Sequence, residues 1–269
     1  MNSAEQSPKP VRIRREPPQF RDVEVRAVES AGPRLIRLTL AGADLEAMAA
    51  AGAAASVRLL LPPAGKTEIV RPTWNGNEFL LPDGRRPPIR TFTPLRADPD
   101  AGDLALEIVV HGAGVASTWA ATAEPGRRAA ISGPGRRYTV DLDAPAFLLA
   151  GDETAIPAIS QLLEAVPRAT PVHVCIEVAQ PDGRVALPGR PRVSVEWCDL
   201  PRGAPPGDAM VAAVRAAELP PDARIWAAGE AAAVQRIRRY LFEERGISRA
   251  RTSVRGYWKH GRAGETDDA

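Results

Sequence analysis

The sequence lacks the features that mark membrane-spanning and secreted proteins. No run of roughly eighteen apolar residues occurs in its 269 residues, so no transmembrane helix is expected. Met1 to Phe20 mix charges with prolines and hold no apolar core segment, so we expect a loose tail here rather than a secretory signal. The only two cysteines, Cys175 and Cys198, lie in apolar strand-like runs, as expected of buried free thiols in a reducing compartment.

Metal-ligand patterns and a strong charge of one sign are also missing. The chain has no C-x-x-C pair, and His111, His173 and His260 lie far apart in sequence, so neither a zinc site nor an iron–sulfur cluster is expected. The net charge of only +2 does not favour a nucleic-acid partner. The basic residues are nearly all arginine, which we attribute first to genome composition.

The first half of the chain is typical of a small antiparallel β-barrel. Short strand-like runs are separated by turns rich in proline and glycine, and one short helix is expected near Ala116 to Ala123. The clearest run, Leu104 to His111, has apolar residues at every second position, as a half-buried strand does. The expected strands are Val23 to Val28, Leu35 to Leu40, Val57 to Leu61, Leu104 to His111 and Arg128 to Ser132.

The second half alternates strands with helices, which indicates a doubly wound, mostly parallel α/β sheet. The expected strands are Ala146 to Ala150, Val172 to Val178, Val193 to Trp197, Arg224 to Ala228 and Arg251 to Tyr257. The expected helices are Ile156 to Val166, Asp208 to Ala217 and Ala231 to Arg245. We therefore divide the chain into a tail over residues 1–18, a barrel domain over 19–142, an α/β domain over 143–262 and a second tail over 263–269.

Arg90-Thr91-Phe92-Thr93-Pro94 is the first candidate binding segment. An arginine two residues before an aromatic residue on a strand places a guanidinium and a ring on the same side. The guanidinium suits a pyrophosphate, the ring can pack on a flavin, and the Thr93 hydroxyl can bond a ring heteroatom. A surface strand with one charge and a core phenylalanine would explain the same residues.

His111 to Ser117 follow a strand and open a helix. Gly114 lets the backbone approach a ligand closely, the helix N-terminus offers N–H groups to a phosphate, and Ser117 adds a hydroxyl. The alternative is a glycine turn in which Ser117 caps the helix and His111 is an ordinary residue at a strand end.

Two further segments lie after strands of the α/β half, at the edge where such sheets bind nucleotides. The segment Gly151-Asp152-Glu153-Thr154-Ala155 is not a dinucleotide fingerprint, and its two carboxylates would repel a pyrophosphate. We expect helix capping by these residues, with nicotinamide contact by Thr154 and its backbone. Ala228-Gly229-Glu230 either flanks the same crevice or is a simple turn before a helix.

The last candidate binding residues are aromatic and basic. Tyr257 ends the last expected strand and Trp258 follows it, so these aromatic residues can cover a flavin face, whereas a solvated basic tail is the alternative for Lys259 and His260. Arg184 follows the second strand of the α/β half and could meet a 2′-phosphate, which favours NADPH over NADH. Glu177 argues the other way if its carboxylate points into the crevice.

Taken together and in this order, the segments resemble the siderophore-interacting protein family, the FAD-dependent ferric-siderophore reductases of the ferredoxin reductase-like superfamily. The resemblance spans Arg21 to Gly261, nearly the whole chain. It includes Glu124-Pro125-Gly126 and Gly256-Tyr257-Trp258 beside the segments above. Two positions depart from the family pattern: Phe92 stands where tyrosine is usual, and Val115 where proline is usual.

The resemblance implies binding roles for these residues. FAD is expected to contact Arg90, Thr91, Phe92, Thr93, Val109, His111, Gly114, Ala116, Ser117 and Trp258. NADPH or NADH is expected to contact Asp152, Glu153, Thr154, Ala155, Ala228, Gly229 and Glu230. An anionic ferric siderophore is expected to approach the flavin edge past Arg85, Arg86, Lys259 and Arg262.

The implied reaction is hydride transfer from NAD(P)H to FAD across the domain crevice, followed by single-electron transfer to the ferric siderophore and release of Fe²⁺. The chemistry belongs to the flavin, so no catalytic side chain and no protein-bound metal is assigned. The chain is expected to be a cytoplasmic monomer without membrane insertion. Two alternatives stay open: a flavin reductase or diaphorase with another acceptor, and a non-catalytic siderophore- or flavin-binding module.

Overall fold

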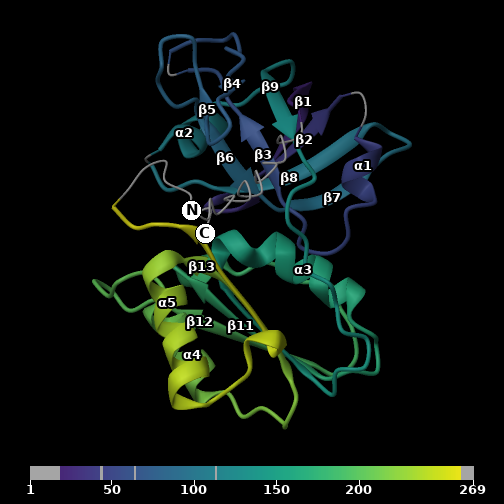
Figure 1. The fold of residues 1–269 in the computed structure, drawn as a ribbon, viewed down its shortest axis with the longest axis vertical. Helices are drawn as coiled ribbons and strands as arrows, with labels where there is room; N and C mark the ends of the chain where they lie inside the picture. The colour runs from purple at the N-terminus through teal and green to yellow at the C-terminus, as the bar shows by residue number, and fades with distance from the viewer. Residues whose placement is uncertain (1–18, 43–44, 64, 113, 262–269) are drawn as a thin grey trace, which may run out of the picture.

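Two sheets, one from each half of the chain, form the body of the molecule (Figure 1). The computed structural model describes residues 19–42, 45–63, 65–112 and 114–261. The two expected tails, residues 1–18 and 263–269, therefore lie outside the described residues. None of the helices within the described ranges is long and apolar enough to cross a membrane.

The N-terminal sheet has seven strands in the order β6-β3-β9-β1-β2-β8-β7, and every ladder in it is antiparallel. Its edge strands β6 and β7 are consecutive in the chain and meet at Thr93, so the sheet curves into a barrel that the covalent chain closes. The strands are β1 (Arg21–Gly32), β2 (Leu35–Ala41), β3 (Val57–Leu60), β6 (Ile89–Phe92), β7 (Pro94–Asp98), β8 (Asp103–Val109) and β9 (Arg128–Ser132).

Alternate residues of these strands fill the barrel. Leu38, Leu40, Leu104 and Leu106 are fully buried, and Trp119 of α2 (Val115–Ala121) packs in the same cluster. The period-2 pattern of the sequence thus reports which strand face is buried. A second short helix, α1 (Glu46–Ala49), lies between β2 and β3 in the chain.

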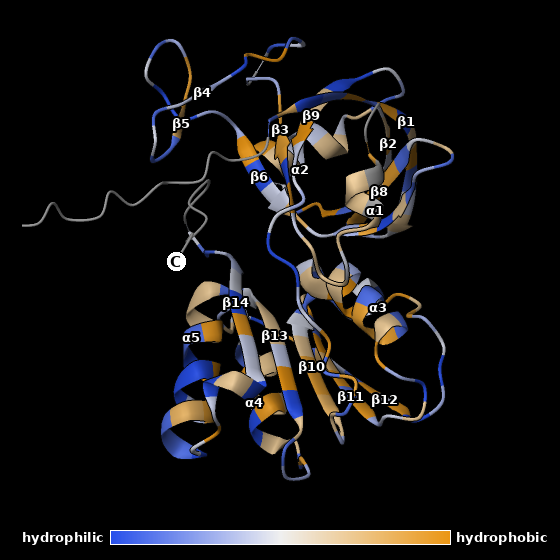
Figure 2. Ribbon diagram, turned by 45° about the vertical axis from the view of Figure 1, so that its right-hand side comes forward, coloured by the Kyte–Doolittle hydropathy of each residue, from blue (hydrophilic) through white to orange (hydrophobic). Residues whose placement is uncertain are grey.

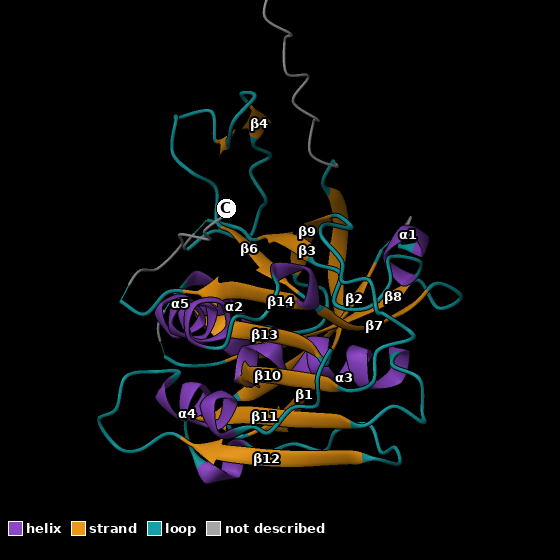
Figure 3. Cartoon of the chain, turned by 60° about the horizontal axis from the view of Figure 1, so that its bottom comes forward, coloured by secondary structure: helices purple, strands orange, loops and turns teal. Residues whose placement is uncertain are grey.

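A small hairpin, β4 (Thr73–Trp74) with β5 (Phe79–Leu80), projects from the barrel (Figure 3). The ring of Phe79 lies edge-on to both Trp74 and Phe20, with centroids 5.1 and 5.3 Å apart. This hairpin was not predicted from the sequence, because strands of two residues carry no periodic signal.

The C-terminal sheet has five parallel strands in the order β12-β11-β10-β13-β14. The chain starts in the middle, adds two strands to one side and then two to the other, so the order reverses between β10 and β13. Such a switch point is where doubly wound sheets bind ligands, at the carboxyl ends of the strands. The strands are β10 (Phe147–Asp152), β11 (Val172–Val178), β12 (Val193–Asp199), β13 (Arg224–Glu230) and β14 (Thr252–Trp258).

Helices cover both faces of this sheet, whose central strands are strongly apolar (Figure 2). Phe147 and Leu149 face α3 (Ile156–Ala165), whereas Leu148 and Ala150 face α4 (Asp208–Ala216) and α5 (Ala231–Arg239). The barrel followed by a doubly wound parallel sheet confirms the predicted fold class.

Several predicted boundaries were off by a few residues for identifiable reasons. Strand β10 runs two residues past Ala150, because Gly151 and Asp152 still pair with β11. Strand β8 ends at Val109, so His111 lies outside it. The helix predicted to reach Arg245 changes at Tyr240 into a π-helical turn over Tyr240–Glu244.

Side chains from α3 and its preceding turn connect the two halves. Gln161 donates from Nε2 to the carbonyl of Pro94 at 2.7 Å and accepts the amide of Ala54 at Oε1, also at 2.7 Å. Arg34, in the β1–β2 turn, forms an ion pair with Glu153 at 3.1 Å. Helix α3 therefore lies against the barrel as well as against its own sheet (Figure 1).

Gly151 is required by the close approach of the turn after β10. A Cβ atom at this position would lie 2.4 Å from the Cβ of Ala155 and 3.2 Å from the carbonyl oxygen of Ala228. We expect Gly151→Ala to destabilise the protein by roughly 1–3 kcal/mol, as overpacking does. Gly189→Ala is the matched control, since a Cβ there meets no atom within 4 Å. Urea unfolding midpoints that are equal for the two variants would show that the turn accommodates a methyl group.

Candidate functional site

The carboxylate of Asp152 joins three segments at the switch point. Its Oδ1 accepts the amide of Thr154 at 2.9 Å and the hydroxyl of Thr154 at 2.5 Å. Its Oδ2 accepts the amide of Glu230 at 3.0 Å and the indole Nε1–H of Trp258 at 2.8 Å. One buried side chain thus ties together the ends of β10, β13 and β14.

The surroundings of Asp152 are shaped to it. Burial raises the pKa of the Asp152 carboxyl above its ordinary range, and the hydrogen bonds from Thr154, Trp258 and Glu230 oppose that shift. A Cβ atom on Gly229 would lie 2.5 Å from Oδ2 of Asp152, so only glycine fits beside it. The predicted capping is confirmed for Asp152 only, whose side chain caps the short turn over Glu153–Ala155; α3, which follows that turn, has Ala155 as its N-cap and no side-chain cap.

Glu230 is a second buried carboxylate at the same edge. Its Oε2 accepts the amide of Ala233 at 2.9 Å and so caps α5. Its Oε1 accepts the amide of His260 at 3.2 Å. Together with Asp152, it holds residues 258–260 against the carboxyl end of the sheet.

Most residues predicted to contact the nicotinamide are buried. Asp152, Glu153, Ala155, Ala228 and Glu230 are each at most 9% exposed. Thr154 is half-buried, but its amide and its hydroxyl both donate to Asp152, so only the lone pairs of the hydroxyl oxygen are left for a ligand. Glu153 instead faces Arg34 of the barrel; burial raises the pKa of Glu153, and the Arg34 charge opposes the shift.

The predicted flavin segment meets the last strand of the α/β half. The hydroxyls of Thr93 and Tyr257 lie 3.4 Å apart, and Thr93 is only 6% exposed. Burial raises the pKa of Tyr257 above its ordinary value. The barrel segment expected to contact FAD and the sheet edge expected to contact NAD(P)H therefore lie next to each other.

Arg90 is a half-buried cation without an acidic partner among the described residues. Its Nη1 donates to the carbonyl of Ile89 at 2.7 Å, and burial lowers the pKa of its guanidinium. An arginine stays charged even so, and a desolvated charge favours an anionic ligand. This environment suits the phosphate role predicted for Arg90.

Phe92 and α2 share one side of the barrel. The half-buried ring of Phe92 packs against the barrel core, as do Val115 and Ala116 of α2. The alternative of a core phenylalanine is thus compatible with the packing. Thr91 is exposed on the opposite face of β6.

The turn before α2 is built around Gly114, whose φ of +84° favours glycine. Ser117 is buried, and its hydroxyl accepts the amide of the exposed His111 at 3.0 Å. Ser117 therefore braces the turn, and the alternative in which it caps the helix is wrong, since the N-cap residue is Gly114. Val109, at the end of β8, lines a small hollow with Arg34 and Glu153, where the two halves meet.

The structure places the basic residues predicted to attract the siderophore in more than one part of the chain. Arg85 pairs with Asp83 and Arg86 with Glu78, each at 2.7 Å, near the β4–β5 hairpin. Lys259 is half-buried and follows β14, at the edge held by Asp152. Arg262 lies outside the described residues.

Glu177 and Arg184 have internal partners. Glu177 accepts the amides of Gly207 at 2.6 Å and Met210 at 3.0 Å, and so serves the N-terminus of α4. This role of Glu177 was not predicted from the sequence. Gly207, the N-cap residue of α4, has no side chain that could cap the helix, and this was the signal that an acceptor from elsewhere was needed. Arg184 is paired with Asp199 through contacts of 2.7 Å to both carboxylate oxygens. Since both groups are partly exposed, the guanidinium of Arg184 can still meet a phosphate.

The two halves match two family models in the order that the fold requires. Residues 24–138 match the model described as siderophore-interacting FAD-binding domain, and residues 144–261 match the model described as siderophore-interacting protein. The chain belongs to the siderophore-interacting protein family. The resemblance inferred from the sequence motifs is thereby confirmed.

Similar proteins agree with this assignment. The crystal structure of a siderophore utilization protein from T. fusca is 33% identical, with a TM-score of 0.83 over 94% of this chain and 98% of that one. The NADPH-dependent ferric-chelate reductase of Escherichia coli is 29% identical over 89% of this chain and 93% of its own length. The ferredoxin reductase in carbazole 1,9a-dioxygenase shares the fold, with 15% identity and a TM-score of 0.65 over 89% of this chain and 69% of that one.

Arg90→Ala tests whether the unpaired guanidinium binds the FAD phosphates. A charged phosphate contact contributes roughly 1.5–3 kcal/mol, so FAD should bind about 10–150-fold more weakly. Arg96→Ala, at an exposed position of β7, is the control and should retain FAD. Fluorescence titration of flavin-free protein measures the affinity. An unchanged Kd in Arg90→Ala would mark Arg90 as a structural charge.

Proposed function

We propose that this chain is an NAD(P)H-dependent, FAD-containing ferric-siderophore reductase that releases iron as Fe²⁺. The observation that carries the proposal is the contact of Thr93 with Tyr257 beside the Asp152 and Glu230 anchors. It joins the predicted flavin segment to the switch-point edge of the parallel sheet. The family membership and the ferric-chelate reductase of Escherichia coli support the substrate class.

The residues present fit FAD at the barrel. Arg90 offers a cation with no acid beside it in the described structure, and the turn at Gly114 exposes backbone amides where no side chain caps α2. Phe92 offers part of a ring at the barrel edge, next to the buried hydroxyl of Thr93. When bound, FAD supplies the exchange between two-electron donors such as NAD(P)H and one-electron acceptors.

The sheet edge would orient the nicotinamide. Thr154 donates its amide and hydroxyl protons to Asp152, so it would meet the nicotinamide through the lone pairs of its hydroxyl oxygen, while the buried carboxylates of Asp152 and Glu230 accept from internal donors. Because those carboxylates are bonded inward, their lone pairs are not directed at the dinucleotide. Trp258 and Tyr257, held at the same edge, would limit the access of water to the reacting atoms.

Iron reduction needs no ligand from the protein. Siderophore oxygens are hard donors that suit Fe³⁺ better than Fe²⁺, so reduction loosens the metal. The protein has only to attract an anionic complex to the flavin edge, which fixed positive charge does. Lys259 is the candidate for that charge in the described part of the chain.

The visible spectrum of the purified protein tests the proposal. We expect an FAD spectrum that bleaches with NADPH in the absence of oxygen and recovers when a ferric siderophore is added, while an Fe²⁺ chelator develops its colour. Reduction of free flavin at a higher rate than any ferric siderophore would instead identify a general flavin reductase. Protein that binds FAD but never bleaches with NADPH or NADH would identify a binding module.

Lys259→Ala tests the basic approach. We expect it to raise KM for an anionic ferric siderophore severalfold and to flatten the fall of kcat/KM with added salt, because steering by fixed charge is screened by ions. Lys66→Ala is the matched control, because Lys66 is exposed and distant in sequence from Lys259. The NADPH half-reaction without acceptor should not change. If kcat/KM and its salt dependence match wild type, Lys259 belongs to an ordinary solvated surface.

Arg184→Ala tests the nucleotide preference. We expect wild type to prefer NADPH, and loss of the guanidinium to lower kcat/KM for NADPH about 10-fold or more while leaving NADH nearly unchanged. Arg168→Ala is the control, since Arg168 is exposed in the loop before β11, at the amino end of the parallel strands. Equal kcat/KM for the two nucleotides in wild type would remove Arg184 from the site.

A further inference from the structure

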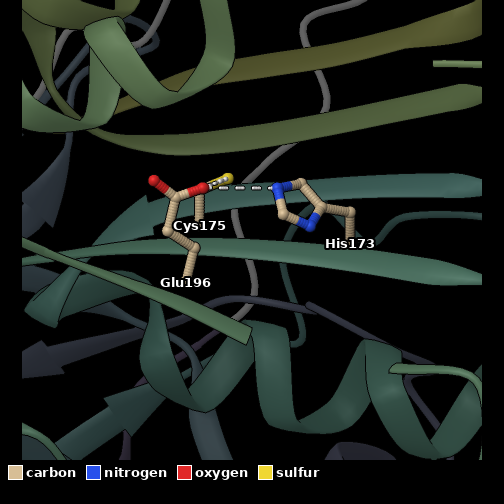
Figure 4. A group of neighbouring side chains, drawn as sticks. All are labelled: His173, Cys175 and Glu196. Carbon is tan, nitrogen blue, oxygen red and sulfur yellow. Dashed lines mark hydrogen bonds and ion pairs between the residues drawn. The ribbon is translucent and has the colours of Figure 1, made fainter. Parts of the chain in front are cut away.

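Three potential metal ligands converge on the strands β11 and β12 (Figure 4). His173 and Cys175 are two residues apart on β11 and therefore point to one face. The parallel register places Ser194 opposite His173, and Glu196 opposite Cys175. No zinc site was expected from the sequence, because the histidines lie far apart along it; these three ligands come together only through the pairing of β11 with β12.

The distances between the donor atoms suit one ion. Nε2 of His173 lies 3.5 Å from Oε2 of Glu196, and Sγ of Cys175 lies 3.9 Å from the same oxygen. All three donor atoms lie within 4.8 Å of one another. Tetrahedral zinc with its usual bond lengths separates nitrogen from oxygen by about 3.4 Å and sulfur from oxygen by about 3.6 Å. Those two pairs need to move by only a few tenths of an ångström, whereas the nitrogen of His173 and the sulfur of Cys175, which lie within 4.8 Å of each other, have to close toward about 3.6 Å.

A further contact orients the histidine. Nδ1 of His173 lies 2.7 Å from the hydroxyl of Ser194, which leaves Nε2 directed at Glu196 (Figure 4). Histidine ligands of metals usually have their second nitrogen held in this way. The site is open on one side, because the side chains of His173 and Glu196 are 29% and 52% exposed while Cys175 is fully buried.

We propose that His173, Cys175 and Glu196 bind one Zn²⁺ ion, with water as the fourth ligand on the open side. A thiolate, an imidazole and a carboxylate in tetrahedral arrangement are a ligand set that zinc favours, and the sulfur disfavours Mg²⁺ and Ca²⁺. Binding releases the Cys175 thiol proton to solvent, so the thiolate and the Glu196 carboxylate together balance the charge of the ion.

The position of the site indicates what the ion does. Among the strands that the structure describes, β12 is at the edge of the parallel sheet and pairs only with β11. His173 is the second residue of β11, so the ion would lie toward the amino end of the strands and away from the edge that holds Asp152. It would therefore fasten the edge strand to the sheet without touching the flavin. The proposal is independent of the proposed reductase function.

Metal binding by tag-free, chelator-treated flavoprotein tests the proposal. A competition titration with a chromogenic chelator should give one equivalent of Zn²⁺. Co²⁺ in its place should give a thiolate charge-transfer band and tetrahedral bands in the red, beyond the flavin absorption. His173→Asn and Glu196→Gln, both at partly exposed positions, should weaken Zn²⁺ at least tenfold, and Cys175→Ala should abolish the charge-transfer band. Zn²⁺ should raise Tm in wild type and not in His173→Asn.

Matched controls decide the ligand set. His260→Asn removes an imidazole elsewhere, and Cys198→Ser removes the neighbouring thiol, two residues beyond Glu196 on β12; both should keep the Zn²⁺ affinity within twofold of wild type. Absence of a stoichiometric Zn²⁺ equivalent overturns the proposal. So does an unchanged affinity in both His173→Asn and Glu196→Gln. A loss in Cys198→Ser as large as that in His173→Asn would overturn this assignment of ligands.

Discussion

The acceptance of four hydrogen bonds by the Asp152 carboxylate is the constraint on which the site depends. The donors come from the turn after β10, the start of α5 and the aromatic end of β14. These segments lie far apart in sequence, and the one carboxylate accepts hydrogen bonds from all three. A buried acceptor that lost these donors would carry a penalty of about 1–3 kcal/mol. The geometry of the sheet edge is therefore fixed by one acid and not by three independent loops.

The relation between the two halves follows from a few contacts around α3. Gln161 spans from Ala54 to Pro94, Glu153 pairs with Arg34, and Thr93 reaches Tyr257. A carboxamide that both donates and accepts across an interface loses two hydrogen bonds if the interface slides. The barrel edge is thereby kept in register with the switch point of the sheet.

The sequence predicted much of the fold, since strand alternation and helix periodicity are local signals. Arg128–Ser132 and Val172–Val178 were predicted to the residue. The roles that were missed depend on pairs distant in sequence. Glu177 serves α4 across 30 residues, and Glu196 meets Cys175 only through the register of two parallel strands. The solvent exposure of the motif residues could not be predicted from the sequence either. Ala155 and Ala228 belong to the motifs, yet both are fully buried, so their small side chains serve to let neighbouring backbone segments approach each other.

The aromatic end of β14 has a consequence for how the protein is made. Trp258 and the amide of His260 supply donors to Asp152 and Glu230, yet they follow every other described strand in the chain. Synthesis runs from the N-terminus, and domains fold as they emerge. The barrel and most of the parallel sheet can thus fold while two buried acids still lack one donor each. The edge that is expected to bind the nucleotide is finished only when the last strand has emerged, so a chain that stops short of Trp258 would keep its core and lose its site.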